Sequence, residues 1–467
     1  GLSTLLIEGA ATVGGGMRTK QLTLPGFQHD VCSAVHPMAL DSAFFRELDL
    51  EKYGLEWIFP PVCLAHPQDD GSGGLLFRSV PETAASLGID GKAYKEMMNP
   101  LLEDWEKIKQ GVFGPLRFPR HPLALARFGL SARHSARNLA LGRFKGEAAR
   151  ALFGGISAHS ILSLDKSPSA AAGLLLALCA HAIGWPVPRG GAQAIANAMA
   201  ACFKELGGEI ITGWQVETLE ELPSSRVVLC DLTPRQLMRL VGDRLPASYR
   251  RRLERYRYGP GVFKVDYALS GSVPWKNPLC DAASTVHLGG TLAEITRSEA
   301  VVAAGHTSEK PFVLVTQPAL FDNSRAPEGY QTLWAYCHVP HGSTENMLER
   351  IEGQLERFAP GFKELIMARH VMNTGQMEQY NPNYVGGDIN GGIQDWGQLF
   401  TRPVVSLNPY ATAVEGLYLC SSSTPPGGGV HGMCGYWAAR SALAKLGISH
   451  SFKDQLSGKS RLSSYAG

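Results

Sequence analysis

The chain has 467 residues, 44% of them hydrophobic, so it can form two interleaved domains or one elaborated domain, and it is too large for a small binding module. Its 44 basic and 42 acidic residues give a net charge of +2, and no Lys/Arg-rich run stands out, so no nucleic-acid partner is expected. The nine cysteines include no CxxC pair, which predicts reduced thiols and argues against a zinc site or a redox disulfide.

The first predicted element is a short strand at residues 5–8, which ends in Glu8 and precedes a glycine loop at Gly14, Gly15 and Gly16. A carboxylate at a strand end can accept hydrogen bonds from ribose hydroxyls, and glycines let a diphosphate approach the backbone closely. Arg18 can pair with such a diphosphate. The pattern indicates a strand inside a nucleotide-binding sheet, and the alternative is a surface strand followed by an ordinary loop.

Residues 94–206 are predicted to be mainly helical, because apolar residues recur there at intervals of three and four. The longest uncharged apolar stretch, residues 170–183, is shorter than the roughly 20 residues of a membrane-spanning helix, so we expect a buried helix and no transmembrane segment. Contact with a membrane surface stays compatible with the sequence. Residues 1–8 lack the basic and apolar parts of a signal peptide, which favours a cytoplasmic location.

Alternating apolar residues predict a return to the first sheet, with strands at residues 209–212, 216–219 and 226–230. A second sheet is expected from strands at residues 261–269, 284–288, 311–316 and 332–339, and a helix is expected at residues 344–358. Near the end, a strand at residues 416–420 leads into a Pro/Gly loop and an apolar helix at residues 432–446. This order directs a helix N-terminus at a ligand.

Several segments resemble flavoproteins of the phytoene desaturase and amine oxidase superfamily, in the family's own order. Glu8 and the following Gly-Gly-x-Arg-Thr run resemble its second nucleotide-binding signature. Further similar strings lie at residues 185–191, 208–211 with Val216, 417–420 and 426–432. Longer strings at residues 258–269, 285–291 and 381–388 resemble the family that includes pyridine nucleotide-disulphide oxidoreductase domain-containing protein 2.

The resemblance implies an α/β fold, in which a FAD/NAD(P)-binding Rossmann-like domain is interleaved with a mixed-sheet and helical substrate domain. The FAD-binding domain is expected at residues 1–75, 188–250 and 405–467, and the substrate or cap domain at residues 76–187 and 251–404. The family opens with a strand and a GxGxxG turn that bind the FAD diphosphate, and this chain is expected to begin after them. Gly427, Gly429 and Gly432 also spell GxGxxG, but they follow a loop and are not expected to form a Rossmann entrance.

FAD is the cofactor that the resemblance implies. Glu8 would hold the adenosine ribose, Arg18 would lie at the diphosphate, and Val216 would offer backbone groups to the adenine. The full set expected at the cofactor is Glu8, Gly14, Gly15, Arg18, Thr19, Val216, Ser422, Gly428, Gly429, Val430, Gly432 and Met433. Independently of the family, a glycine loop before a helix N-terminus suits negative charge on a reduced flavin, and the alternative is a plain loop and helix cap.

The catalytic side chains stay open, because flavin carries hydride chemistry itself and the protein mainly has to orient the substrate and exclude solvent. Candidates for proton transfer are His36, His287, His338, His341, His431, Tyr384 and Asp388, although a structural or surface role is the favoured interpretation of each one alone. No Glu/His metal spacing is present, so no metal site is expected. The apolar helices and aromatic residues favour an apolar small-molecule substrate, although core packing uses the same residue types.

Two other functions stay open. The Rab GDP-dissociation inhibitors use the same architecture to bind proteins and prenyl lipids without flavin redox chemistry. The chain could also be an inactive fragment, whose open sheet edge would favour misassembly. The substrate, the electron acceptor and the oligomeric state are not predicted.

Overall fold

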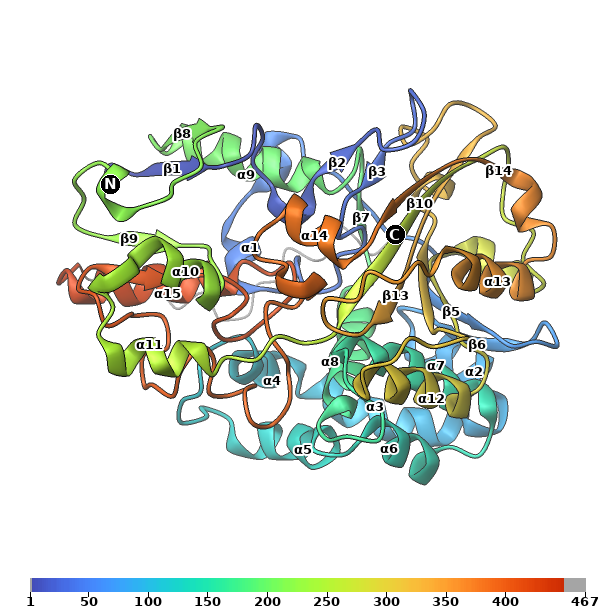
Figure 1. Cartoon of the computed structure of the whole chain (residues 1–467). Helices are drawn as coiled ribbons and strands as arrows, with labels where there is room; N and C mark the ends of the chain where they lie inside the picture. Colours follow the sequence, from blue (N-terminus) through green and yellow to red (C-terminus); the bar gives the residue numbers. More distant parts are fainter. Residues whose placement is uncertain (1, 449–467) are drawn as a thin grey trace.

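Two pairs of parallel strands form the smaller β framework of the chain. The structure is a computed structural model, and it describes residues 2–448. β1 (Leu5–Glu8) pairs with β8 (Glu209–Thr212), and β9 (Val228–Cys230) pairs with β15 (Leu417–Leu419). Each pair joins segments that are far apart in the sequence, so the chain crosses between its two parts more than once, as the interleaved α/β prediction expects (Figure 1).

A seven-stranded mixed sheet forms the larger framework. Its strands, in spatial order, are β14 (Ile366–Met372), β10 (Gly261–Leu269), β13 (Gln331–Val339), β12 (Val313–Thr316), β11 (Ala283–Leu288), β5 (Val62–Pro67) and β6 (Gly73–Leu76). All neighbours are antiparallel except β11 and β5. Side chains alternate between the faces of a strand, so Val262 of β10 packs with the helical cap, whereas Phe263 packs on the opposite side against Leu355 and Phe358.

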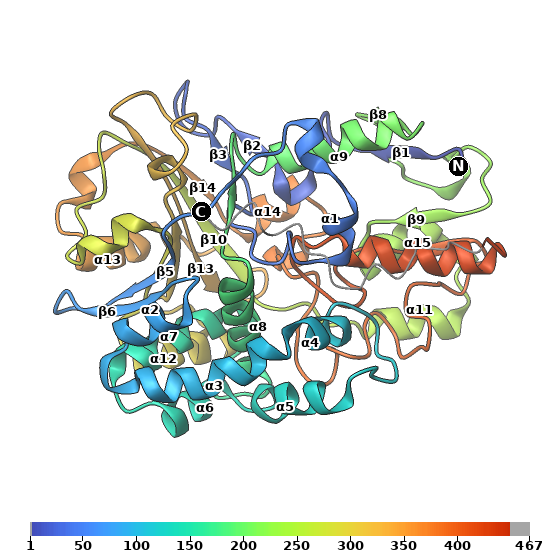
Figure 2. The ribbon, with the colours of Figure 1, turned by 180° about the vertical axis from the view of Figure 1, so that it is seen from behind.

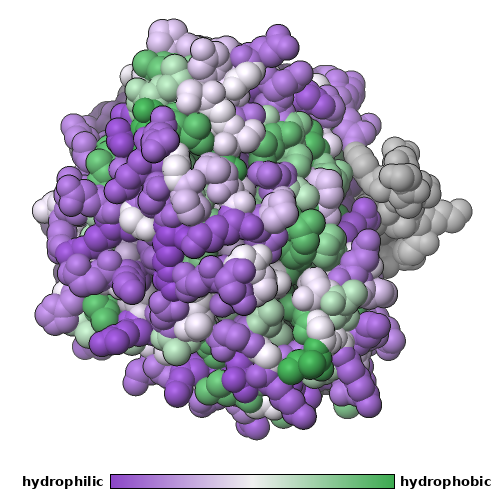
Figure 3. All heavy atoms as spheres, turned by 90° about the vertical axis from the view of Figure 1, so that its right-hand side faces the viewer, coloured by the Kyte–Doolittle hydropathy of each residue, from purple (hydrophilic) through white to green (hydrophobic). Residues whose placement is uncertain are grey.

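Helices cover both faces of this sheet. The cap comprises α2 (Val80–Ser86), α3 (Gly91–Glu103), α4 (Trp105–Val112), α5 (Pro122–Ala132), α6 (Ala136–Arg143), α7 (Glu147–Ser157) and α8 (Ser169–Ala182), and α12 (Leu292–Ala303) lies beside it (Figures 1 and 2). α8 is the buried helix that the apolar stretch predicts. α13 (Leu348–Phe358) covers the other face, and the surface on that side of the molecule is mostly polar, with small separate apolar groups (Figure 3).

The remaining elements lie around the small strand pairs or beside the large sheet. They are α1 (Ala43–Glu47), α9 (Gln193–Glu205), α10 (Pro234–Val241), α11 (Ala247–Glu254), α14 (Thr374–Tyr380), α15 (Met433–Lys445) and the short strands β2 (Thr19–Lys20), β3 (His29–Asp30), β4 (Trp57–Ile58) and β7 (Val187–Pro188). None of the helices within residues 2–448 combines the length and the apolar character that crossing a bilayer requires.

The structure corrects the sequence-based prediction in two places. No strand forms at residues 216–219; a turn of 3-10 helix begins at Leu219 instead, because Thr218 and Glu221 form a capping box. Residues 62–76, which the prediction places in the FAD-binding part, form β5 and β6 of the seven-stranded sheet. The other predicted domain boundaries stay predictions, and residues 449–467 lie outside the described residues.

Candidate functional site

A cavity of about 1380 Å³ lies between the small strand pairs, the seven-stranded sheet and the cap. Segments from both ends of the chain form its wall. The predicted cofactor residues that line it are Glu8, Gly14, Gly15, Ser422, Gly428, Gly429, Val430 and Gly432. Arg18, Thr19, Val216 and Met433 lie outside the lining. The motif at residues 8–15 and the motif at residues 422–432 therefore line one cavity, and the cap and the seven-stranded sheet form the rest of its wall.

The first wall follows β1. Oε1 of Glu8 accepts a hydrogen bond from the backbone N–H of Ala10 at 2.8 Å and lies 3.3 Å from Nη2 of Arg18. The Arg18 side chain is buried, and it donates to the backbone oxygen of Thr12 at 2.6 Å from Nη2. Arg18 thus supports the loop that carries Gly14 and Gly15 from behind, instead of reaching into the cavity.

Thr19 and Val216 also take supporting positions. Oγ1 of Thr19 donates to Oδ1 of Asp30 at 2.7 Å and accepts from the backbone N–H of Gln193 at 3.1 Å, which joins the glycine loop to α9. Val216 is partly buried and follows Trp214, whose backbone N–H donates to the backbone oxygen of Glu8 at 3.1 Å. The segment after β8 therefore lies next to the acidic end of β1.

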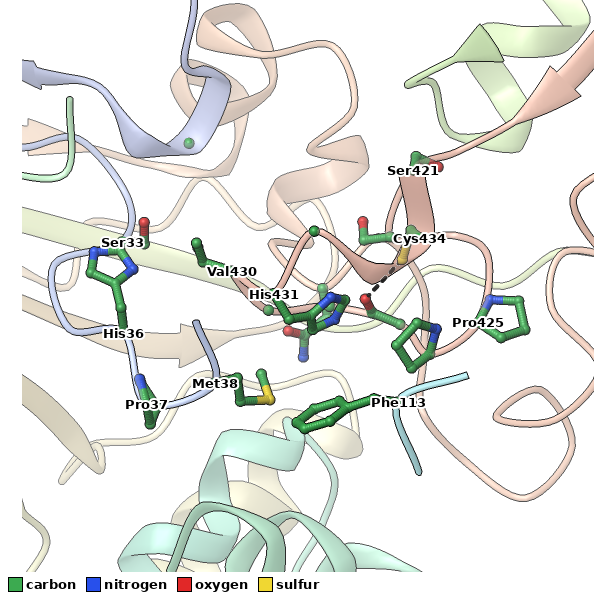
Figure 4. Close-up of a pocket in the computed structure, with 18 of the residues that line it drawn as sticks. Ser33, His36, Pro37, Met38, Phe113, Ser421, Pro425, Val430, His431 and Cys434 are labelled. Atoms are coloured by element: carbon green, nitrogen blue, oxygen red, sulfur yellow. Dashed lines mark hydrogen bonds between the residues drawn. The ribbon is translucent and has the colours of Figure 1, made fainter. Parts of the chain in front are cut away.

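The opposite wall is the loop before α15, residues 421–432, which lies across from Ser33 and His36 (Figure 4). Gly429 has φ 130°, and a Cβ there would lie 2.0 Å from Cε of Met38. Gly432, with φ 67°, is the N-cap of α15, and a Cβ there would lie 2.1 Å from the Phe44 ring. Larger residues do not fit at either position without displacing Met38 or Phe44.

The first turn of α15 directs backbone donors and a positive dipole end towards the cavity. The side chain of His431 lies in this wall, and its Nδ1 accepts the backbone N–H of Met433 at 3.0 Å. Cys434 is buried, and burial raises the pKa of its thiol to about 11. Burial likewise raises the pKa of the Cys32 thiol to about 11. Both thiols in the wall stay protonated at neutral pH, so they are poor nucleophiles.

Polar side chains from the seven-stranded sheet form the floor. Thr285 of β11, Thr316 of β12 and Trp334 of β13 line the cavity, and each is buried. The hydroxyls of both threonines and Nε1 of Trp334 find no hydrogen-bond partner among the described residues. Buried polar atoms are normally paired, so these three atoms mark the places where a ligand or water would complete the site.

Lys264 is a fourth floor residue, and the site residues predicted from the sequence included none of the four. Its side chain lies on β10 and is almost fully buried, its Nζ pairs with the carboxylate of Asp266, and Nζ lies 5.6 Å from the centre of the Trp334 ring. Burial acts to raise the pKa of Asp266, but Lys264 and His370 outweigh it and lower that pKa below its usual value. Two charged residues at spacing i, i+2 inside an otherwise apolar strand were the available signal.

The proton-transfer candidates separate into two groups. His36, His431 and Tyr384 line the cavity, and burial lowers the pKa of both imidazoles to about 4, so they are neutral at pH 7. The other candidates lie outside the lining, where they bond to protein groups: His287 to His159, His338 to Glu299, His341 to Gly259, and Asp388 to Gly259 and Asn390. Within residues 2–448, no cluster of His, Cys, Asp and Glu is arranged to hold a metal.

Comparison with known proteins supports the resemblance seen in the sequence. No protein-family model matches the chain. It is 26% identical over 308 residues to mouse pyridine nucleotide-disulfide oxidoreductase domain-containing protein 2, covering 56% of this chain and 52% of that protein. It is 24% identical over 275 residues to the neurosporene-forming phytoene desaturase of Rhodobacter capsulatus, covering 53% and 51%. The chain thus spans about half the length of the curated relatives it matches.

Solved structures share the fold over nearly the whole chain. An oxidoreductase from Methanosarcina mazei has a TM-score of 0.62 at 15% identity and covers 95% of this chain and 94% of its own. Putrescine oxidase bound to putrescine has a TM-score of 0.56 at 18% identity and covers 96% and 94%. The sequence resemblance to phytoene desaturase is confirmed, and the solved structures, which include amine oxidases, confirm the α/β fold.

Proposed function

We propose that this chain is an FAD-dependent oxidoreductase, which moves a hydride between a carbon centre of an apolar substrate and the flavin. One observation carries the proposal: Glu8, the glycine loop at Gly14 and the loop at residues 427–432 line a single cavity whose floor is the seven-stranded sheet. A strand-end acid and a glycine loop are the features with which dinucleotide-binding folds hold ribose and diphosphate.

The residues present fit FAD. Glu8 lines the cavity, and its Oε2 forms no hydrogen bond or ion pair among the described residues, so it can accept from ribose hydroxyls. Gly429 and Gly432 line the same cavity and carry no side chain that would keep a ligand from the backbone. Both ring nitrogens of buried His36 have no partner among the described residues, so they are available to a polar ring edge. When bound, FAD would accept or return the hydride.

The chain's own residues would supply binding, orientation and exclusion of water. The N-terminus of α15 favours negative charge beside the loop at residues 427–432. Lys264 holds a positive charge at the floor, and its ion pair with Asp266 fixes its position. Next to it the lining is apolar, including Val262, Leu314 and Trp334, which suits an apolar substrate and keeps bulk water away.

Titration of the purified chain with FAD, followed by quenching of flavin fluorescence, tests the cofactor. Glu8→Gln removes a charged acceptor, so it should weaken FAD binding about 10-fold or more. Glu328→Gln is its matched control at an exposed carboxylate. Gly429→Ala should also weaken binding, whereas Gly353→Ala, where a Cβ meets nothing within 4 Å, should not.

A second comparison uses the chain preceded by a strand and a GxGxxG turn. Flavin absorption bands in either protein, sensitive to Glu8→Gln, support the oxidoreductase. Absence of flavin from both would contradict the proposal and favour a lipid or protein binder without redox chemistry. A flavin that both proteins hold unchanged by Glu8→Gln and Gly429→Ala would place the cofactor elsewhere and reject this site.

A further inference from the structure

Large apolar side chains project from the cap between α4 and the end of α5. Leu116 is 73% exposed, Phe118 98%, Leu123 83% and Leu130 60%. Phe118 lies in the connection between the helices, and Leu123 and Leu130 lie on α5, where Ala124 and Phe128 face the core instead. These exposed side chains therefore lie on an outer face of the cap.

The same segment is strongly basic. Residues 107–146 contain nine Lys and Arg residues and no Asp or Glu, whereas the net charge of the whole chain is only +2. The basic residues are spaced along the segment, so they form no contiguous run in the sequence. Four pair with carboxylates from other segments: Lys107, Lys109, Arg127 and Arg137. The others, which form no ion pair within residues 2–448, are Arg117, Arg120, Arg133, Arg143 and Lys145.

The basic residues near the exposed leucines and phenylalanine lie close enough for their positive charges to act on one another. Burial, together with the positive charges of Arg120 and Arg440, lowers the pKa of Arg117. Arg117 also lies over the Trp437 ring, with 4.7 Å between its Cζ and the ring centre. A surface that gathers like charges attracts an anionic partner.

This face lies at the mouth of the cavity. Leu116, Trp396 and Phe400 line the cavity and are also about half exposed or more, so they lie where it meets solvent. The rings of Trp396 and Phe400 stack with centroids 5.8 Å apart. Their segment, between α14 and β15, runs beside α4 and α5 in both ribbon views (Figures 1 and 2).

We propose that this basic and apolar face, comprising Leu116 to Leu130 with Arg133, docks the protein on an anionic lipid surface. Apolar side chains enter the boundary between headgroups and acyl chains, and arginines beside them contact the anionic headgroups. A second copy of the chain does not fit this charge, because a symmetric contact would place the same unpaired arginines against each other. A nucleic acid would match the charge and leave Phe118, Leu123 and Leu130 in water.

Docking here would open the cavity towards the lipid, but it depends only on the surface and not on a bound flavin. Co-sedimentation of the full chain with vesicles tests it, using phosphatidylcholine alone and phosphatidylcholine mixed with phosphatidylglycerol. We expect binding to the mixed vesicles. Phe118→Ser with Leu123→Ser should weaken it about 10-fold or more, and Arg120→Gln with Arg133→Gln should weaken it on the order of 10-fold.

Matched controls change exposed residues outside this face: Ile89→Ser with Leu279→Ser, and Arg251→Gln with Arg255→Gln. These should bind vesicles as the parent does, and thermal unfolding checks that all variants fold. Lipid binding unaffected by both test pairs would overturn the proposal. Binding that only the arginine pair weakens, matched by equal binding to heparin, would assign the face to an anionic polymer. Failure to bind vesicles, with a change of oligomeric state in the Phe118 and Leu123 variant, would assign it to a second copy.

Discussion

At the scale of single residues, Lys264 and Asp266 show how a charged pair is tolerated in the interior. Both side chains are almost fully buried on β10, and His29 and His370 lie within 3.7 Å and 3.4 Å of the Asp266 carboxylate. Burial lowers the pKa of His29 to about 4, despite the nearby acid. The network therefore depends mainly on the lysine to compensate the Asp266 charge.

Lys264→Met should destabilise the fold by about 3 kcal/mol, because it leaves a buried carboxylate without its main partner. Combining it with Asp266→Asn should recover much of that loss, since the uncompensated charge is removed. Urea unfolding of the parent, the two single variants and the double variant measures the coupling free energy between Lys264 and Asp266. Lys276→Met, at an exposed position, is the control and should change stability by less than about 0.5 kcal/mol. Additive effects in the double variant would contradict the paired role.

Buried histidines predict a dependence of stability on pH. Burial lowers the pKa of His29, His36, His66, His181 and His431 to about 4 and that of His159 to about 3, from 6.5. Below pH 6.5 the unfolded chain binds protons that the folded chain does not, so stability is complete above 6.5 and falls as the pH drops towards 4. Each group contributes at most about 1.4 kcal/mol per pH unit.

His36→Phe isolates one of these groups. Both its ring nitrogens lack partners among the described residues and its ring packs edge-on against Trp57, so phenylalanine removes a proton site without breaking a hydrogen bond. The unfolding free energy, measured by urea between pH 7 and 5, should depend less steeply on pH, by up to about one proton. An unchanged slope would show that His36 does not titrate with unfolding.

At the scale of elements, the sequence predicts those that have a strong period and clear ends. The strands at residues 5–8, 209–212 and 261–269 are found with the predicted bounds, and the closing helix differs by one residue at each end. These segments are either continuous apolar runs between turn residues or follow a glycine loop. The local sequence pattern is sufficient to predict an element where the apolar positions it marks are also the positions that the fold buries.

The errors have tertiary causes. Residues 216–219 alternate as a strand would, but the local capping box at Thr218 competes successfully because no neighbouring strand pairs with them. β14 was not predicted, since its exposed and partly buried residues give no clean alternation, and its pairing with β10 defines it. β5 and β6 join the larger sheet through a parallel contact with β11, a choice that no local sequence signal specifies.

The candidate site was predictable to a similar degree. Glycine-rich loops and a strand-end acid can be identified locally, so Glu8, Gly14, Gly429 and Gly432 were found and lie on the cavity. Arg18 and Thr19 were assigned to the cofactor because of their residue types, whereas their side chains bond to Thr12 and Asp30. Lys264, Thr285 and Thr316 come from three strands of one sheet, and only the strand register brings them together.

At the scale of the whole molecule, the cavity joins two strand pairs that share no strand. Glu8 belongs to the β1 and β8 pair, while the loop at residues 427–432 follows the β9 and β15 pair. Side-chain packing, such as that of Phe44 of α1 against Gly432, contributes to the cavity, but no shared strand links the two walls. A ligand that contacts both walls would therefore add cooperativity that strand pairing does not supply.

FAD added to the chain should slow amide hydrogen exchange at residues 14–18 and 427–434 together, because one bound molecule must be released before either wall opens. At a concentration 100 times the Kd, the added stability is about 2.7 kcal/mol, which corresponds to roughly 100-fold slower exchange in both segments. Glu8→Gln, at a fixed FAD concentration, should reduce protection in both walls to the same extent, although it alters only the first. Protection lost at residues 14–18 but retained at residues 427–434 would mean that the ligand contacts one wall alone, and the two strand pairs would then open independently.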